Sequence, residues 1–137
     1  MKNLIITAFL LFLAPVGVMG QTTAGKQNHY VVTTTKINQL EPILMAAEEL
    51  KVEDGNRFGQ FKILVCGKAV ESLARRQTMG PYLKRAQEVG AQIIACQYSM
   101  RQLNMEKDFL TEGVQSVDNA ILENLQLQRE GYISLGL

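Results

Sequence analysis

The sequence Ala91-Gln-Ile-Ile-Ala-Cys96, followed at once by Gln97-Tyr-Ser-Met-Arg-Gln-Leu103, decides the fold class of this 137-residue chain. The first six residues are mostly apolar and predict a buried strand. The residues after them predict the start of a helix, with Gln97 or Ser99 near its N-cap. A thiol at this junction faces the positive end of the helix dipole, which favours the nucleophilic thiolate. Cys96 is therefore the first candidate for chemistry.

The same alternation of strand and helix extends over residues 30–137. Strands are predicted at 30–35, 61–66, 91–96 and 114–117, with a terminal strand or tail at 132–135. Helices are predicted at 40–50, 69–77, 82–89, 99–104 and 120–129. Gly80-Pro81 is expected to break the chain, and the last helix is expected to bury Ile121, Leu122 and Leu125. This order indicates an α/β fold whose parallel sheet has helices on both faces.

The first 20 residues have the pattern of a secretory signal peptide. Lys2 forms a positive n-region, and residues 4–13 form an apolar h-region. Val18-Met-Gly20 offers residues that a signal peptidase tolerates at a cleavage site. The sequence therefore predicts an exported protein, periplasmic or secreted.

An uncleaved membrane anchor is the alternative, because residues 3–25 carry no charge and are long enough to span a bilayer. Pro15 and Gly17, late in the run, favour cleavage. After cleavage, a polar leader (21–28) is expected to precede one α/β domain (29–137), with no membrane segment.

Charge argues against several classes of partner. The chain has 14 basic and 13 acidic residues, and the two counts become equal once Lys2 is removed. No basic surface is implied, so nucleic acid and anionic membranes are not expected as partners. Two cysteines and one histidine without close spacing do not predict a metal site, and no glycine-rich phosphate loop is present in the sequence. We expect neither a metal nor an organic cofactor.

Cys66 ends the strand predicted at 61–66, just as Cys96 ends the strand at 91–96. Sites in parallel α/β sheets gather at the carboxyl ends of the strands. If the two strands are neighbours they lie about 4.8 Å apart, near the lower end of the Cα separations found in disulfides. The pair can be a resolving pair of thiols or a structural disulfide. Alternatively, Cys66 is a small core residue.

Four side chains near the cysteines are candidate substrate-binding residues: Lys68, Tyr98, Ser99 and Arg101. Lys68 and Arg101 either bind an anion or face solvent, and Lys68 could also stabilise a thiolate. Tyr98 either lines the site or covers an apolar patch at a subunit contact. The single histidine, His29, precedes the first strand, at the opposite edge of the sheet from the cysteines. A Cys–His dyad within one subunit is therefore not expected.

Two segments carry a resemblance to a known family: Gly90-Ala-Gln-Ile-Ile-Ala-Cys96 and Leu125-Gln-Leu-Gln-Arg-Glu-Gly-Tyr132. The supporting segments are Val65-Cys-Gly-Lys-Ala-Val70, Ser99-Met-Arg101, Leu103-Asn-Met105 and Leu110-Thr-Glu-Gly-Val114. In this order, over nearly all of residues 29–137, they resemble the DsrE/DsrF-like (YchN-like) family of small α/β sulfur-relay proteins.

The resemblance implies a three-layer α/β/α sandwich with a mostly parallel sheet of about five strands, and a homo-oligomer, often a trimer or hexamer. It also implies that Cys96 accepts sulfane sulfur as a persulfide. Cys66 is a candidate resolving partner because of its place at the end of the strand predicted at 61–66. The expected partners are thiol proteins or small sulfur compounds.

Two alternatives to sulfur transfer remain: a non-catalytic oligomeric interaction module, and a thiol redox sensor that uses the Cys66–Cys96 pair. An accessible Cys96 favours sulfur transfer. A buried Cys96, or a stable Cys66–Cys96 bridge, favours the interaction module.

Overall fold

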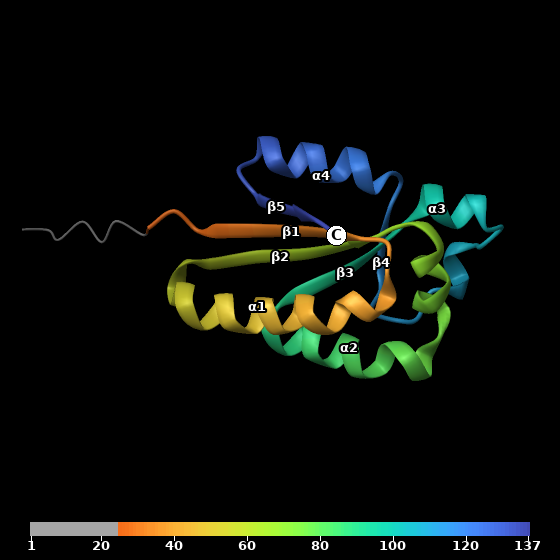
Figure 1. The fold of residues 1–137 in the computed structure, drawn as a ribbon, viewed down its shortest axis with the longest axis horizontal. Coiled ribbons are helices and arrows are strands. Elements are labelled where there is room, and N and C mark those ends of the chain that lie inside the picture. The colour runs from red at the N-terminus through yellow and green to blue at the C-terminus, as the bar shows by residue number, and fades with distance from the viewer. Residues whose placement is uncertain (1–24) are drawn as a thin grey trace, which may run out of the picture.

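The sheet at the centre of the computed structural model has five strands in the order β4-β3-β2-β1-β5 (Figure 1). The structure describes residues 25–137. The strands are β1 (Asn28–Thr34), β2 (Phe58–Val65), β3 (Ala91–Cys96), β4 (Gln115–Val117) and β5 (Ile133–Gly136). All neighbouring strands pair in parallel. The predicted α/β fold is therefore confirmed, and the carboxyl-terminal segment is a strand.

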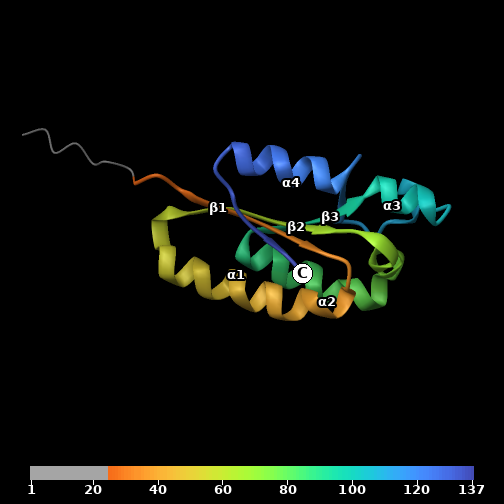
Figure 2. The same ribbon diagram turned by 45° about the horizontal axis from the view of Figure 1, so that its top comes forward.

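Helices cover both faces of the sheet, as Figure 1 and Figure 2 show. The helices are α1 (Leu40–Asp54), α2 (Arg76–Val89), α3 (Gln97–Gln102) and α4 (Ala120–Arg129). The 3-10 segments are η1 (Ile37–Gln39), η2 (Gly55–Arg57), η3 (Gly67–Ala74) and η4 (Lys107–Phe109). α1 and α2 lie on one face, α4 lies on the other, and α3 follows the carboxyl end of β3. The expected three-layer sandwich is present.

The expected signal peptide (1–20) and most of the expected leader (21–28) lie outside the described residues. β1 begins at Asn28, the last residue of that leader. Within residues 25–137, no helix has the combination of length and apolar character that crossing a bilayer requires.

Successive strand residues point to opposite faces of the sheet and so contribute to two different cores. The larger core lies under α1 and α2 and includes Ile63 and Ala95. The smaller core lies under α4 and includes Leu64, Ile94 and Cys96. The alternation along β3 therefore turns Cys96 toward α4, and the geometry of α4 decides the surroundings of the thiol.

The region before β3 differs from the sequence-based expectation. The chain is not broken at Gly80-Pro81, because α2 runs through this pair with Pro81 inside the helix. Proline removes one helical hydrogen bond, but the burial of Met79 and Val89 against the larger core outweighs that local cost. The helix expected at 69–77 is instead the 3-10 segment η3.

α4 has the predicted bounds, but it turns a different face to the sheet. Its exposed large apolar side chains are Ile121 (68% exposed), Leu122 (53%) and Leu125 (56%), and its buried ones are Ala120 and Leu127. The prediction that the first three are buried was therefore wrong. We call these three residues the α4 stripe.

Polar contacts explain this rotation of α4. The Asn124 side chain donates to Thr33 Oγ1 at 2.8 Å, and Glu123 pairs with Lys62 at 3.5 Å. Both contacts hold the Ala120–Leu127 side of the helix against the sheet. The α4 stripe consequently faces away from the core.

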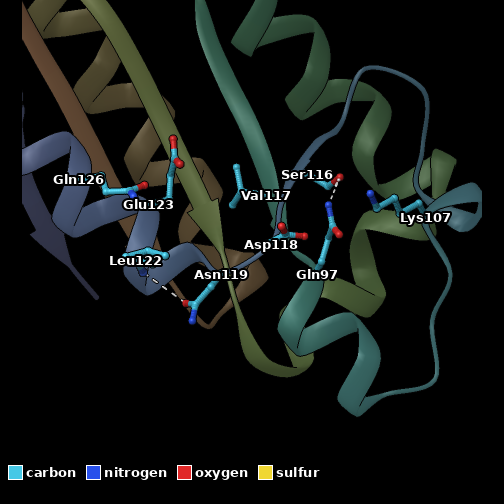
Figure 3. A pocket seen from close by; sticks show the side chains of 9 residues that line it. All are labelled: Gln97, Lys107, Ser116, Val117, Asp118, Asn119, Leu122, Glu123 and Gln126. Carbon is cyan, nitrogen blue, oxygen red and sulfur yellow. Dashed lines mark hydrogen bonds between the residues drawn. The ribbon is translucent and has the colours of Figure 1, made fainter.

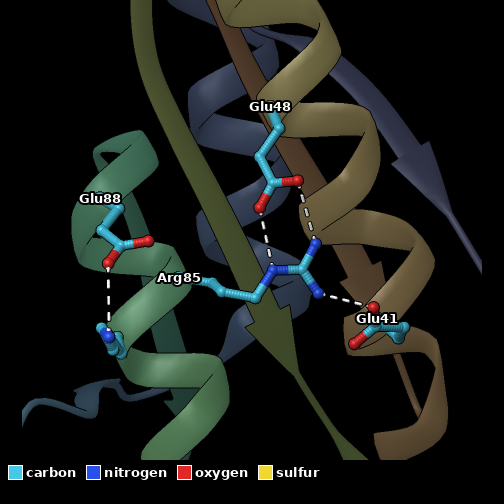
Figure 4. Close-up of polar contacts among 5 residues, drawn as sticks. Glu41, Glu48, Arg85 and Glu88 are labelled. Atoms are coloured by element: carbon cyan, nitrogen blue, oxygen red, sulfur yellow. Dashed lines mark hydrogen bonds and ion pairs between the residues drawn. The ribbon is translucent and has the colours of Figure 1, made fainter.

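An ion-pair cluster joins α1 to α2 (Figure 4). The Arg85 guanidinium donates to both carboxylate oxygens of Glu48, at 2.9 and 3.0 Å, and to Glu41 at 2.6 Å. The hydrogen bonds from Arg85 lower the pKa of Glu48. Such a two-pronged contact fixes the relative position of the two helices, so its role is structural.

Candidate functional site

Cys66 and Cys96 leave the sheet side by side at its carboxyl edge. The residues before them, Val65 and Ala95, are partners in the register of β2 and β3. Cys66 packs against the smaller core that contains Cys96. Both thiols are free, with Cys66 half-buried and Cys96 buried. The structure thus confirms that the two cysteines are neighbours, and it holds them as a dithiol.

Cys96 is held by two helices. It is the N-cap residue of α3, which begins at Gln97, two residues before the predicted start. Its side chain makes no close capping hydrogen bond to α3, although Ser99 of that helix acts on the thiol electrostatically. The hydrogen bond comes instead from the backbone N–H of Ala120, the first residue of α4, which lies 3.5 Å from Cys96 Sγ. The predicted helix dipole is present at α3, and α4 adds a donor that was not predicted.

The surroundings of Cys96 favour its thiolate. Burial raises the pKa of the thiol, since the side chain is only 4% exposed. The N–H of Ala120 and the N–H and hydroxyl groups of Ser99 act in the other direction and outweigh burial, so the pKa of Cys96 lies below its usual value. The Tyr98 N–H contributes least, because it donates to the Asp118 carbonyl at 3.0 Å.

Cys66 has the opposite tendency. Burial, the negative charge of Cys96 and a side-chain hydrogen bond with Cys96 raise the pKa of Cys66 to about 12. At neutral pH the pair therefore divides into a thiolate-prone Cys96 and a protonated Cys66. The charge of the Cys96 thiolate contributes to this shift of Cys66, because two adjacent thiolates repel each other.

Ser99 links the segments that follow the two cysteines. Its hydroxyl oxygen accepts a hydrogen bond from the N–H of Gly67, the residue after Cys66, at 2.9 Å. The same side chain is buried and helps to lower the pKa of Cys96. The structure thus brings Ser99 into the site, as predicted, in contact with the chain at both cysteines.

The other three predicted residues lie further out. Lys68 is exposed at the start of η3. Tyr98 is 54% exposed, and the Arg101 guanidinium lies 6.0 Å from the centre of its ring. Within the described residues, neither Lys68 nor Arg101 forms a side-chain hydrogen bond or an ion pair with a cysteine. These three side chains border the site without entering it.

Sequence analysis missed the contribution of α4. Asn119 caps this helix, and its side-chain oxygen accepts from the N–H groups of Ile121 and Leu122 at 3.0 and 3.3 Å. The signal was available, because an asparagine directly before an apolar helix is a common N-cap. The direction in which the capped helix points depends on packing, which the pattern does not contain.

A cleft of about 440 Å³ borders the same junction (Figure 3). We call it the α4 cleft. It is lined by Gln97, which follows Cys96, by Val117, which pairs with Cys96 across the sheet, and by Asn119, which precedes Ala120. Lys107 of η4 and Glu123 of α4 lie on its opposite sides.

The remaining features of the described region do not form a second reactive centre. His29 lies near the start of β1, at the opposite end of the sheet from the cysteines, as predicted. Its Nδ1 accepts from the Gln60 N–H at 2.9 Å, and its ring stacks on Tyr132. Within residues 25–137, no three histidine, cysteine or acidic side chains gather in a way that could hold a metal ion.

Comparison with known proteins gives fold relatives. No family model matches the chain, and no curated protein matches it. The protein of unknown function MTH1491 from Methanobacterium thermoautotrophicum is similar in structure, with a TM-score of 0.68 at 18% identity over 80% of this chain and 100% of its own. BT1422 from Bacteroides thetaiotaomicron, also of unknown function, has a TM-score of 0.54 at 18% identity over 78% of this chain and 94% of its own. At this identity the likeness establishes the α/β fold alone.

Proposed function

We propose that this protein carries sulfane sulfur as a persulfide on Cys96. The observation that supports the proposal is the hydrogen bond from the Ala120 N–H to Cys96 Sγ at 3.5 Å, made to a cysteine that is only 4% exposed. Burial without nearby donors raises the pKa of a cysteine and leaves it inert. Here the donors of Ala120 and Ser99 offset the burial, which is the arrangement that a thiolate nucleophile requires.

Sulfur transfer to Cys96 is a thiol exchange. The Cys96 thiolate attacks the outer sulfur of a donor R–S–SH, the S–S bond of the donor breaks, and R–S⁻ leaves. The proton stays on the transferred sulfur, which gives Cys96–S–SH. An acceptor thiolate then attacks that outer sulfur and regenerates the Cys96 thiolate. Neither step consumes an oxidant or a reductant.

Cys66 is the proposed resolving partner, and it does not react while its thiol is protonated. A Cys66 thiolate would attack the inner sulfur of Cys96–S–SH, form a Cys66–Cys96 disulfide and expel HS⁻. The pKa of about 12 keeps Cys66 protonated at neutral pH. The carried sulfur is thereby protected from loss to the neighbouring thiol.

The proposal extends to partners and location. Thiol proteins or small sulfur compounds donate and accept the sulfur, in an exported protein, periplasmic or secreted. Assembly into a homo-oligomer, a trimer or hexamer by the family resemblance, is supported by the α4 stripe. A cluster of exposed apolar side chains on one helix is typical of a contact surface.

A non-catalytic interaction module is the second candidate, and two observations favour it. Cys96 is buried, as expected for an interaction module, and the α4 stripe is exposed. In such a module Cys96 would serve to fill the smaller core. Sulfur transfer instead requires a donor small enough to reach a thiol that is 4% exposed, or an opening movement at the start of α4.

Intact mass spectrometry after exposure of the reduced protein to polysulfide separates the candidates. The wild type and Cys66→Ser are expected to gain one sulfur atom, and Cys96→Ser is expected to gain none. Circular dichroism of each variant checks that the fold is retained. No gain by the reduced wild type, or an equal gain by Cys96→Ser, excludes the carrier. Formation of a Cys66–Cys96 disulfide without sulfur gain indicates a redox sensor.

A further inference from the structure

We propose that the α4 cleft binds a small zwitterionic thiol of the cysteine or glutathione class, which delivers sulfane sulfur to Cys96. The inference rests on the proposed function, because it names the substrate class of the same site.

The cleft borders the position at which Cys96 leaves the sheet, and its lining includes the chain and sheet neighbours of Cys96 but not Cys96 itself. Gln97 follows the cysteine in the chain, and Val117 is its partner in β4. Asn119 precedes Ala120, whose N–H donates to Cys96 Sγ. The volume of about 440 Å³ falls within the range of about 300–1,000 Å³ that is common for small-molecule sites. A bound molecule therefore has room next to the residues that flank Cys96, and an opening movement at the start of α4 brings its sulfur to the buried thiol.

The charges of the cleft have both signs. Lys107 of η4 lies on one side, Glu123 of α4 lies on the other, and Asp118 lies between them beside Gln97 (Figure 3). Glu123 is half-buried and is held by Lys62 at 3.5 Å, so its carboxylate has a fixed place. Lys107 and Asp118 are exposed and free to meet a ligand. A molecule that presents a carboxylate to Lys107 and an ammonium group to an acidic side chain of the cleft matches this distribution. Cysteine carries one group of each kind, and glutathione carries a second carboxylate at the other end of the peptide.

The same distribution disfavours purely anionic donors. Inorganic polysulfide and thiosulfate would gain from Lys107 but would meet the carboxylates of Asp118 and Glu123 across the cleft. Neutral hydrogen-bonding groups complete the lining. The Gln97 amide, for example, donates to Ser116 Oγ at 3.0 Å and is thereby fixed in position. These amide and hydroxyl groups suit the peptide-like body of a small thiol.

The cleft holds the part of the donor that leaves. Cys96 attacks the outer sulfur of R–S–SH, the S–S bond breaks, and R–S⁻ is released with its ammonium and carboxylate groups still in contact with the cleft. The sulfur and its proton remain on Cys96. Recognition of R thus determines which compound reacts. The reacting atoms are Cys96 Sγ and the two sulfur atoms of the donor, as in the proposed function.

S-Methylglutathione provides the test, because it carries the zwitterion but has no sulfane sulfur to transfer. Titration followed by amide chemical shifts is expected to move the signals of Gln97 and Asn119. Lys107→Glu is expected to weaken binding by about tenfold or more, since it removes a charge-assisted contact and adds repulsion. Lys84→Glu is the matched control, because Lys84 is an exposed lysine of α2, on the other face of the sheet.

Equal binding by Lys107→Glu and Lys84→Glu would overturn the inference. So would shifts confined to residues outside the cleft. The two proposals can fail separately. If the protein takes up sulfur from inorganic polysulfide but does not bind S-methylglutathione, the proposed ligand of the cleft is rejected and the proposed persulfide on Cys96 is retained. Both proposals are supported if glutathione persulfide loads Cys96 faster than polysulfide does, and if this difference in rate disappears in Lys107→Glu but remains in Lys84→Glu.

Discussion

The backbone N–H of Ala120 donates a hydrogen bond to Cys96 Sγ at 3.5 Å, across 24 positions of sequence. Ala120 begins α4, and Cys96 ends β3. The same helix therefore closes the smaller core and stabilises the thiolate that lies at its edge. Packing and reactivity are linked at this contact, because any movement of α4 changes both.

Alkylation of Cys96 is expected to follow a pKa below that of an ordinary cysteine. The N–H groups of Ala120 and Ser99 stabilise the thiolate in the folded protein and are absent in the unfolded chain. The rate of reaction with a small alkylating reagent, measured against pH in Cys66→Ser, should therefore have its midpoint below that of the same protein in denaturant. Limited access lowers the plateau of the rate without moving the midpoint. A higher midpoint in the folded protein would contradict this expectation.

Asn119→Ala is expected to weaken both the helix and the thiolate. Loss of an N-cap costs about 1 kcal/mol of stability, and fraying of the first turn of α4 withdraws the Ala120 N–H from Cys96. Urea denaturation should detect the first effect, and the alkylation midpoint of Cys96 should rise. Asn119→Ser is the control, because serine can also accept the N–H bonds of the first turn. A loss of stability with an unchanged alkylation midpoint of Cys96 would mean that the Asn119 cap stabilises the helix without affecting the thiolate.

Much of this architecture could be predicted because local patterns decide it. The apolar runs that became β2 and β3 end at Cys66 and Cys96, and parallel pairing then makes the two cysteines neighbours. Their adjacency follows from the pairing of β2 with β3, and strands that are consecutive in the chain are neighbours about two-thirds of the time. The proximity of Ser99 followed equally from its place in the first turn after Cys96.

The rotation of α4 could not be predicted in the same way. Ile121, Leu122 and Leu125 form an apolar stripe in sequence, yet the helix buries Ala120 and Leu127. The choice depends on partners far away in sequence, such as Thr33 for Asn124. The same limit hid the Ala120 donor and the α4 cleft, since both exist only once α4 has docked.

Leu127→Ala and Leu125→Ala should test which face of α4 is buried. Leu127 is 3% exposed and Leu125 is 56% exposed. The first substitution is expected to cost about 2–5 kcal/mol of stability, and the second about 0.5 kcal/mol or less. Chemical denaturation at low protein concentration measures both. If Leu125→Ala costs more stability than Leu127→Ala, the buried face of α4 is the one predicted from the sequence. If the stability cost of Leu125→Ala increases with protein concentration, Leu125 lies at a contact between subunits.

Tyr30→Phe is expected to alter stability at alkaline pH. The Tyr30 hydroxyl donates to Asp54 at 2.6 Å, and burial followed by this interaction raises the pKa of Tyr30 to about 12. An unfolded tyrosine ionises near pH 10, so the unfolded state loses its proton first and the wild type is destabilised as the pH rises from about 10 to 12. Tyr30→Phe does not lose stability in this way, because phenylalanine does not ionise. At neutral pH it is less stable than the wild type by about 1 kcal/mol, because the hydrogen bond to Asp54 is missing. Denaturation at pH 8 and pH 11 should show the gap between the two proteins narrowing; parallel values would contradict the assigned pKa.

The lifetime of a Cys96 persulfide should depend on pH through Cys66. Burial is the largest cause of the raised pKa of Cys66 and persists when Cys96 carries a persulfide, whereas the charge of the Cys96 thiolate does not. The thiolate fraction of Cys66 therefore still increases with pH. That thiolate attacks the inner sulfur of Cys96–S–SH, so release of HS⁻ with formation of the Cys66–Cys96 disulfide should accelerate in parallel. Cys66→Ser has no such thiolate, and its persulfide should persist as the pH rises. Intact mass and sulfide release, followed together at several pH values, measure both species. Equal decay in the two proteins would mean that Cys66 does not reach the persulfide, and the resolving role would fall while the carrier role of Cys96 would stand.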